Sequence, residues 1–261
     1  MPSQFEIDTI VKGIEISWTA WGKMRDEKLV QEDICYVKSQ NGRGFERIFS
    51  VNIAEENQEY RIRQMISYMQ SGAMPDSMLI TPSTRPANLA EILSHEGFGI
   101  DNSAPCMMMA LGSYEEKPSG LTDFSIIDVV TKKQLSDWLA IISAALFGCE
   151  LITLEQISDV LAMDNTRLYL GLKGNKPVTA CMTIMEGDTS ALDMAATREE
   201  YRRQGFASAL INKALIDLRE IGAKTVSLRA EADGVGVYRR LGFKECFKRV
   251  VASCGNCAKG L

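Results

Sequence analysis

The chain has 261 residues and a net charge of −5, and 46% of its residues are hydrophobic and 24% charged. Domains most often contain about 100–150 residues, so this length allows one large domain or two ordinary ones. The composition excludes disordered, collagen-like and coiled-coil proteins. No apolar run reaches the roughly 18–20 residues that a membrane-spanning helix needs. The first residues lack the pattern of a secretory signal, so we expect a cytoplasmic protein without a membrane partner.

The charge is unevenly distributed along the chain. Residues 1–116 contain ten basic and seventeen acidic side chains, a net charge of −7, and residues 117–261 have a net charge of +2. An acidic first half argues against a nucleic-acid-binding protein, which would present a basic face. It suggests instead that the first half could favour a cationic ligand, whereas the mildly basic second half could suit an anionic small ligand.

The seven cysteines are scattered along the chain, and their odd number indicates reduced thiols. Cys254 and Cys257 form a CxxC pattern near the C-terminal end, which we interpret as part of a polar tail. A zinc site would need two further ligands, and the only histidine, His95, is far away in sequence. We therefore predict no metal site.

Apolar periodicity predicts alternating helices and strands in the first half. A helix is expected over residues 7–24, where Ile10, Ile14, Trp18 and Trp21 share one face. Strands are expected at 34–38, 45–53 and 78–82, and helices at 55–70 and 89–95. The three methionines at 107–109 are typical of a buried strand, and the polar stretch at 112–122 is typical of a linker.

The second half follows a clearer pattern. A strand at 124–130 precedes a helix at which Thr131 and Gln134 can form a capping box. A second helix is expected from residue 153. Strands are expected at 167–173 and 177–186, joined by a hairpin turn at Gly174 and Asn175. A strand at 190–197, a helix at 206–221, a strand at 224–230, a short helix at 235–241 and a last strand at 244–252 complete a mixed α/β order.

The most informative motif is Arg202-x-x-Gly205-x-Ala207, which lies between a strand and an amphipathic helix. The first N–H groups of a helix have no intrahelical partner, and the helix dipole makes this end attractive to anions. The two small residues allow a phosphate to approach the backbone, and Arg202 and Arg203 add positive charge. The spacing therefore indicates a phosphate-binding loop.

This motif resembles motif A of the GNAT (GCN5-related N-acetyltransferase) superfamily, and residues 228–243, which end in Leu-Gly-Phe, resemble its motif B. The resemblance covers about residues 121–253. It implies that Ala195, Ala196 and Thr197 pair with the pantetheine arm of acetyl-CoA, the co-substrate. It also implies that the pyrophosphate binds the loop of Arg202, Arg203, Gln204, Gly205, Phe206, Ala207 and Ser208.

The resemblance implies that Tyr238 is the general acid that protonates the departing thiolate. It does not identify a base, because the position at which some members carry a catalytic glutamate falls near Ala191. Asp193, Glu186 and Glu231 are the nearest alternatives, and a route through water is equally open. Many members have asparagine where this chain has Glu231. We expect Glu231 to lie among the cofactor-binding residues.

Residues 78–98 are similar to the second half of a GNAT domain but lack the phosphate loop. We therefore predict an α/β protein of tandem GNAT-like mixed sheets flanked by helices. A degenerate GNAT-like domain is expected at residues 1–115 and an acetyltransferase domain at residues 121–261.

The resemblance implies N-acetylation of a small-molecule or peptide amine by direct attack in a ternary complex. Two other hypotheses stay open: a non-catalytic acyl-CoA-binding sensor or scaffold, and transfer of a longer acyl group. The acceptor cannot be read from the motifs, since function depends on the site rather than on the fold.

Overall fold

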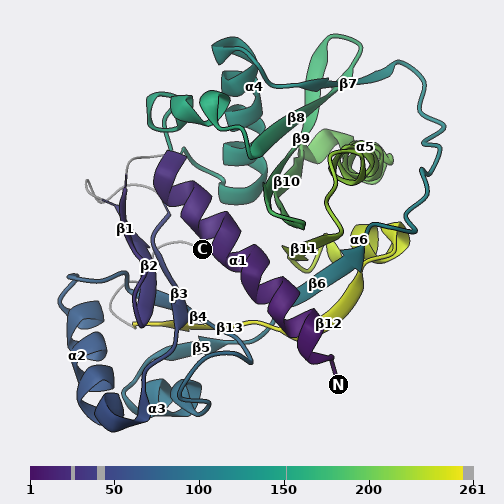
Figure 1. The fold of residues 1–261 in the computed structure, drawn as a ribbon. Helices are drawn as coiled ribbons and strands as arrows, with labels where there is room; N and C mark the ends of the chain where they lie inside the picture. The colour runs from purple at the N-terminus through teal and green to yellow at the C-terminus, as the bar shows by residue number, and fades with distance from the viewer. Residues whose placement is uncertain (25–26, 40–44, 151, 255–261) are drawn as a thin grey trace.

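Two mixed β-sheets flanked by helices form the protein, as a computed structural model shows (Figure 1). The structure describes residues 1–24, 27–39, 45–150 and 152–254. The predicted α/β class with two mixed sheets is thereby confirmed. Within the described residues, no helix is both long and apolar enough to cross a bilayer.

The first sheet has the strand order β1-β2-β3-β4-β13-β5. Helices α2 and α3 pack on it and bury an apolar core with its strands. The bounds of these elements are β1 Lys28–Val30, β2 Ile34–Lys38, β3 Arg47–Val51, α2 Gln58–Gln70, β4 Ser77–Ile80, α3 Leu89–His95, β5 Gly99–Asp101 and β13 Val250–Ser253.

The second sheet has the order β12-β6-β11-β10-β9-β8-β7. Its strands are β6 Pro105–Ala110, β7 Phe124–Asp128, β8 Thr166–Lys173, β9 Lys176–Glu186, β10 Thr189–Thr197, β11 Thr225–Arg229 and β12 Lys244–Lys248. The helical segments that follow the linker are α4 Lys132–Ile142, η2 Ser143–Phe147, η3 Glu155–Ala162, η4 Glu199–Tyr201, α5 Phe206–Glu220 and α6 Val235–Leu241.

Each sheet contains one strand from the other half of the chain. β6, which precedes the linker, pairs with both β11 and β12 of the second sheet. β13 crosses in the opposite direction and pairs with β4 and β5 of the first sheet. The single strand expected at 244–252 is therefore wrong. It is two strands in two different sheets, and the chain passes from one sheet to the other at Arg249.

Helix α1 (Gln4–Met24) lies between the two sheets (Figure 1). One part of its buried surface packs with α4 and the strands β8 and β9, and another part packs with β2, β3 and β6. Gly13 makes the closest approach, because a Cβ atom there would lie 2.0 Å from the Ser227 hydroxyl on β11. The fit of α1 against the second sheet thus depends on a missing side chain.

Helices cover both faces of the second sheet. α4 packs with α1 on one face, where the Trp138 indole N–H donates to the Cys181 carbonyl at 3.0 Å. α5 and α6 pack on the other face. The predicted capping box of Thr131 and Gln134 is present at the start of α4, and Gly174 turns between β8 and β9 with a φ of +59°.

Candidate active site

Strands β10 and β11 part in the middle of the second sheet. Their parallel pairing covers only residues 189–191 and 225–227, although β10 continues to Thr197. Beyond this point β10 has a bulge between Asp193 and Ala196, and Met194 has a φ of +50°. Since Ala196 and Thr197 still pair with β9, the opposite edge of this segment is the one that parts from β11.

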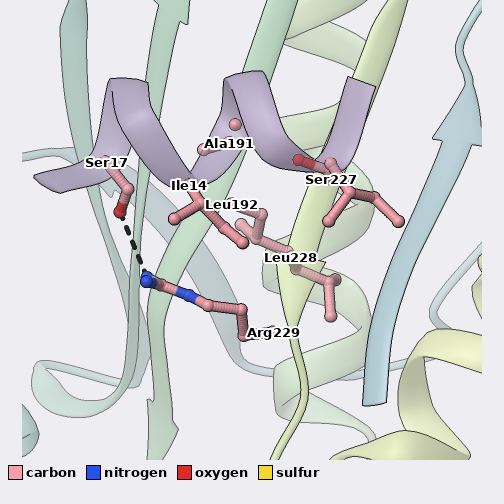
Figure 2. A pocket seen from close by; sticks show the side chains of 9 residues that line it. Ile14, Ser17, Ala191, Leu192, Ser227, Leu228 and Arg229 are labelled. Carbon is pink, nitrogen blue, oxygen red and sulfur yellow. Dashed lines mark hydrogen bonds between the residues drawn. The ribbon is translucent and has the colours of Figure 1, made fainter. Parts of the chain in front are cut away.

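A small cavity of about 10 Å³ lies under α1 where the two strands part (Figure 2). It has room for roughly one water molecule. Its polar lining comes from Ser17 on α1 and from Ser227 and Arg229 on β11. Figure 2 shows the Arg229 side chain reaching from β11 to Ser17, a hydrogen bond of 3.2 Å.

The predicted phosphate loop directly precedes helix α5. Gly205 is the N-cap residue with a φ of +91°, and it leaves the helix start without a side-chain cap. The N–H groups of the first turn are therefore available to an anion. Gly205 has no close neighbour, since a Cβ atom there would lie 3.8 Å from Leu121. Its conformation, rather than crowding, favours glycine.

The side chains of the loop have distinct positions. Arg202 donates to the carbonyls of Thr197 at 3.2 Å and Ala145 at 3.4 Å, and Gln204 donates to the carbonyl of Glu200 at 3.1 Å. Phe206 is buried, and its ring lies 5.1 Å from that of Phe124. Phe206 can therefore offer a ligand its backbone N–H but not its ring.

The remaining predicted loop residues are all at least partly accessible. Arg203 is exposed and adopts a φ of +62°, while Ala207 and Ser208 are partly exposed in the first turn of α5. The structure thus places residues 202–208 at one helix start, adjacent to the end of β10 that carries Ala195, Ala196 and Thr197.

Tyr238 lies on α6 and is 8% exposed. Its ring packs against Phe243 at 5.7 Å, edge to face, and a Cβ atom at Gly234 would lie 3.0 Å from it. Burial raises the pKa of Tyr238 strongly, and negative charge on Cys181, Asp193 and Glu231 would raise this pKa further. The phenol is therefore held in its protonated form, as a proton donor must be.

The three candidate bases are in different situations. Asp193 accepts hydrogen bonds from Ser17, from Trp21 at 3.4 Å, from Arg229 at 2.9 Å and from the backbone N–H of Met194 at 2.9 Å. A carboxylate with so many donors is a positioning group rather than a free proton acceptor.

Glu186 lies at the end of the β9–β10 hairpin, where it pairs with Lys12, and it is away from the bulge. Glu231 has a side chain that is 73% exposed and lies 3.0 Å from Arg249. Ala191 pairs with Ile184 inside the sheet. Of the three candidate bases, Glu231 is thus the most accessible, and its charge also raises the pKa of Tyr238.

The sequence did not indicate the part that α1 plays. Ser17 and Trp21 bring two donors from α1 to Asp193 of the second sheet. Trp21 lies on the apolar face expected for this helix, and it also packs in the core. A single serine within an apolar helix face carries no local signal of such a partner.

The structure also locates the residues considered for metals. Among the described residues, no group of three His, Cys, Asp or Glu side chains could hold a metal ion. His95 is exposed at the end of α3. Cys254 is a free thiol, and the second cysteine of the CxxC pattern, Cys257, lies outside the described residues.

Comparison with known proteins gives a consistent picture. The family model described as "Acetyltransferase (GNAT) domain" matches residues 131–255. A search among curated protein sequences finds no match. A GCN5-related N-acetyltransferase from Kribbella flavida has a TM-score of 0.73 at 17% identity, with 95% of this chain and 98% of that chain covered. One from Sphaerobacter thermophilus has a TM-score of 0.58 at 15% identity, with 94% and 90% covered. These likenesses show the fold, and they extend over both halves of the chain.

Proposed function

We propose that this chain, whose residues 131–255 belong to the GNAT acetyltransferase family, transfers an acetyl group from acetyl-CoA to a primary amine. Membership in the family supports acyl transfer in general, whereas the acetyl donor and the amine acceptor are our inference. The observation that carries it is the parting of β10 from β11, followed directly by a helix start that Gly205 leaves open.

In this proposal the pyrophosphate of acetyl-CoA binds the N–H groups of the first turn of α5. The dipole of the helix and the cationic side chains of Arg202 and Arg203 favour the anion there. The amide groups of the pantetheine arm pair with the edge of Ala195, Ala196 and Thr197 that faces away from β9. An extended amide chain added to a strand edge gains main-chain hydrogen bonds in this way.

The chemistry is a direct displacement. The neutral amine attacks the thioester carbonyl carbon, the carbon–sulfur bond breaks, and the sulfur leaves as a thiolate. Tyr238 donates its proton to that sulfur, because its raised pKa keeps the phenol protonated. The nitrogen, now part of an amide, loses one proton to water, and the Tyr238 phenolate regains a proton from water.

We infer that the nitrogen's proton leaves through water rather than directly to Asp193. The oxygens of Asp193 already accept hydrogen bonds from α1, from Arg229 and from the backbone. Glu231 has an exposed side chain, which lets water reach its oxygens. The amine and acetyl-CoA would be bound together, as direct attack requires.

Two measurements test the proposal together. Titration calorimetry should show binding of acetyl-CoA, and a thiol-release assay against a panel of primary amines should show acetyl-dependent CoA release. Binding without release for any amine would contradict transfer. It would favour the second candidate, a non-catalytic acyl-CoA-binding module, which the fully engaged Asp193 carboxylate supports.

The length of the acyl group can be tested separately. Acetyl-CoA and longer acyl-CoA thioesters, compared with one active amine, should give the highest kcat/KM for acetyl-CoA. A preference for a longer chain would contradict the acetyl donor but leave the acyl transfer itself in place.

A further inference from the structure

Two arginines lie over Trp18 where the two sheets meet, and the charge of a third arginine acts on both of them. Arg47 on β3 and Arg229 on β11 each have their guanidinium carbon 5.9 Å from the centre of a Trp18 ring. Arg249 lies between β12 and β13, at the crossing from one sheet to the other. We call Arg47, Arg229 and Arg249 the arginine cluster.

The charges of the arginine cluster act on one another. Burial and the positive charges of Arg249 and Arg229 together lower the pKa of Arg47 to about 10, although the charge of Asp76 acts in the opposite direction. Burial likewise lowers the pKa of Arg249, and the charge of Arg229 adds to this effect. Like charges that are partly removed from water repel each other, and an anion placed among them would offset the repulsion.

Trp18 and the arginine cluster also carry buried hydrogen-bond donors without acceptors. The indole N–H of Trp18 and the Nε–H of Arg249 are buried and have no partner within the part of the chain that the structure describes. Buried polar groups are rarely left unpaired, because each costs about 1–3 kcal/mol. Two such donors, one of them on a cationic guanidinium, fit an anionic oxygen group.

The arginine cluster adjoins the proposed reaction centre. Asp193 pairs with Arg229 at 2.9 Å, and Glu231 pairs with Arg249 at 3.0 Å. The negative charges of Asp193 and Glu231 both raise the pKa of Tyr238. One ion pair therefore separates each of these arginines from the surroundings of the phenol.

We infer that the acceptor is a primary amine that also carries an anionic oxygen group, a carboxylate or a phosphate, and that the arginine cluster binds this group. The inference rests on the proposed acetyl transfer and names the class of its acceptor. It runs against the cationic ligand that the −7 charge of residues 1–116 suggests. The groups that surround the site, rather than the charge of a whole region, decide what binds there.

The first experiment compares primary amines that differ in the anionic group. Propylamine carries none, β-alanine carries a carboxylate and 2-aminoethyl phosphate carries a phosphate. Phenethylamine and phenylalanine repeat the first comparison with a larger body. We expect kcat/KM to be about 10- to 100-fold higher for an amine that carries the anionic group than for its counterpart without that group, as charge-assisted hydrogen bonds allow. Comparable values for neutral and anionic amines would overturn the inference.

Variants of Arg249 connect the preference to the cluster. Arg249→Gln should remove most of the advantage of the anionic amine, chiefly through KM, and change the neutral amine by about twofold or less. Arg249→Lys, which keeps the charge but not the Nε–H, should give an intermediate result. The control Arg239→Gln alters an arginine on α6 whose side chain is 63% exposed and paired with Glu245. If Arg249 had a purely structural role, Arg249→Gln would lower kcat/KM equally for amines with and without the anionic group. That result would contradict the inference.

A binding measurement separates this inference from the proposed transfer. With CoA present, calorimetry compares N-acetyl-β-alanine with the neutral N-propylacetamide. Tighter binding of N-acetyl-β-alanine that is lost in Arg249→Gln supports the anion site. It does so even if no amine causes CoA release, because absence of release would contradict only the proposed transfer. CoA release with neutral amines, together with equal binding of the two amides, would defeat the anion site alone.

Discussion

The Arg229 guanidinium lies 2.9 Å from the Asp193 carboxylate and joins β11 to β10 beyond the point where their backbone pairing ends. The pair has side chains that are only 15% and 13% exposed. A Ser17 hydroxyl from α1 completes it. One carboxylate thereby holds the parted strands and the first helix in a fixed relation.

Removing this carboxylate should destabilise the protein. Asp193→Ala leaves Arg229 buried without its counter-charge, which we expect to cost about 3 kcal/mol in the free energy of unfolding. Urea unfolding followed by circular dichroism measures the change. As a control, Asp137→Ala removes an exposed pair with Lys133, whose side chain is 85% exposed, and should cost less than about 1 kcal/mol. Equal losses in the two variants would show that the Asp193 pair contributes no more than a surface contact.

Tyr238→Phe tests the general acid. The ring and its packing against Phe243 are kept, and only the hydroxyl is lost. We expect kcat to fall about 10²- to 10⁴-fold with little change in the KM for acetyl-CoA. Tyr60→Phe, on a side chain that is 70% exposed, is the control and should leave turnover unchanged. If Tyr238→Phe turns over at the wild-type rate, the phenol has no part in the mechanism.

The pH dependence of kcat/KM provides a second test of Tyr238. An unshifted tyrosine has a pKa of about 10 and would be half deprotonated there. Because burial raises the pKa of Tyr238, its proton stays bound at that pH. We therefore expect kcat/KM to rise as the amine loses its proton, with no decline up to about pH 11. A decline centred near pH 10, in a range where circular dichroism shows the protein folded, would contradict the raised pKa.

Gly205→Ala tests the phosphate loop. The positive φ of 91° costs an alanine about 1–2 kcal/mol, and the added methyl group stands where a phosphate would approach. We expect lower stability together with a several-fold weaker affinity for CoA, measured by calorimetry. Gly222→Ala is a matched control at the other end of α5, with a φ of +97° and open space around it. It should lose similar stability and bind CoA normally. A normal CoA affinity in Gly205→Ala would remove the loop from the binding site.

Gly13→Ala tests the contact of α1 with β11. The new Cβ atom would overlap the Ser227 hydroxyl, so overpacking of about 1–3 kcal/mol should exceed the gain of up to about 1 kcal/mol from helix propensity. The double variant with Ser227→Ala removes the oxygen and should recover much of the loss. Thermal unfolding of the two single variants and the double variant measures this coupling. Additive losses would show that the two residues do not meet as described.

The sequence predicts the loop and the motifs well because they depend on local geometry. The capping box at Thr131, the turn at Gly174 and the helix start after Gly205 each arise from neighbouring residues. The elements of the second half follow the same local rules, which is why most of their bounds agree within a few residues.

Long-range placement could not be predicted in this way. The methionines of β6 are buried as expected, but nothing local tells which sheet they join. The alternation of residues 244–252 continues through Arg249, so the passage between sheets leaves no gap in the pattern. The arginine cluster combines three segments that are far apart in sequence, and no spacing rule connects them.

The exchange of β6 and β13 makes each sheet depend on the far end of the chain. The place between β4 and β5 stays open until residues 250–253 have been synthesised, although the strands on both sides of it are complete by residue 101. Cutting the gene at the linker would deprive each fragment of an interior strand and leave two unpaired edges in its sheet. The two halves thus exchange strands as the subunits of a domain-swapped dimer do, but within one polypeptide, so each sheet is complete only when both halves are present.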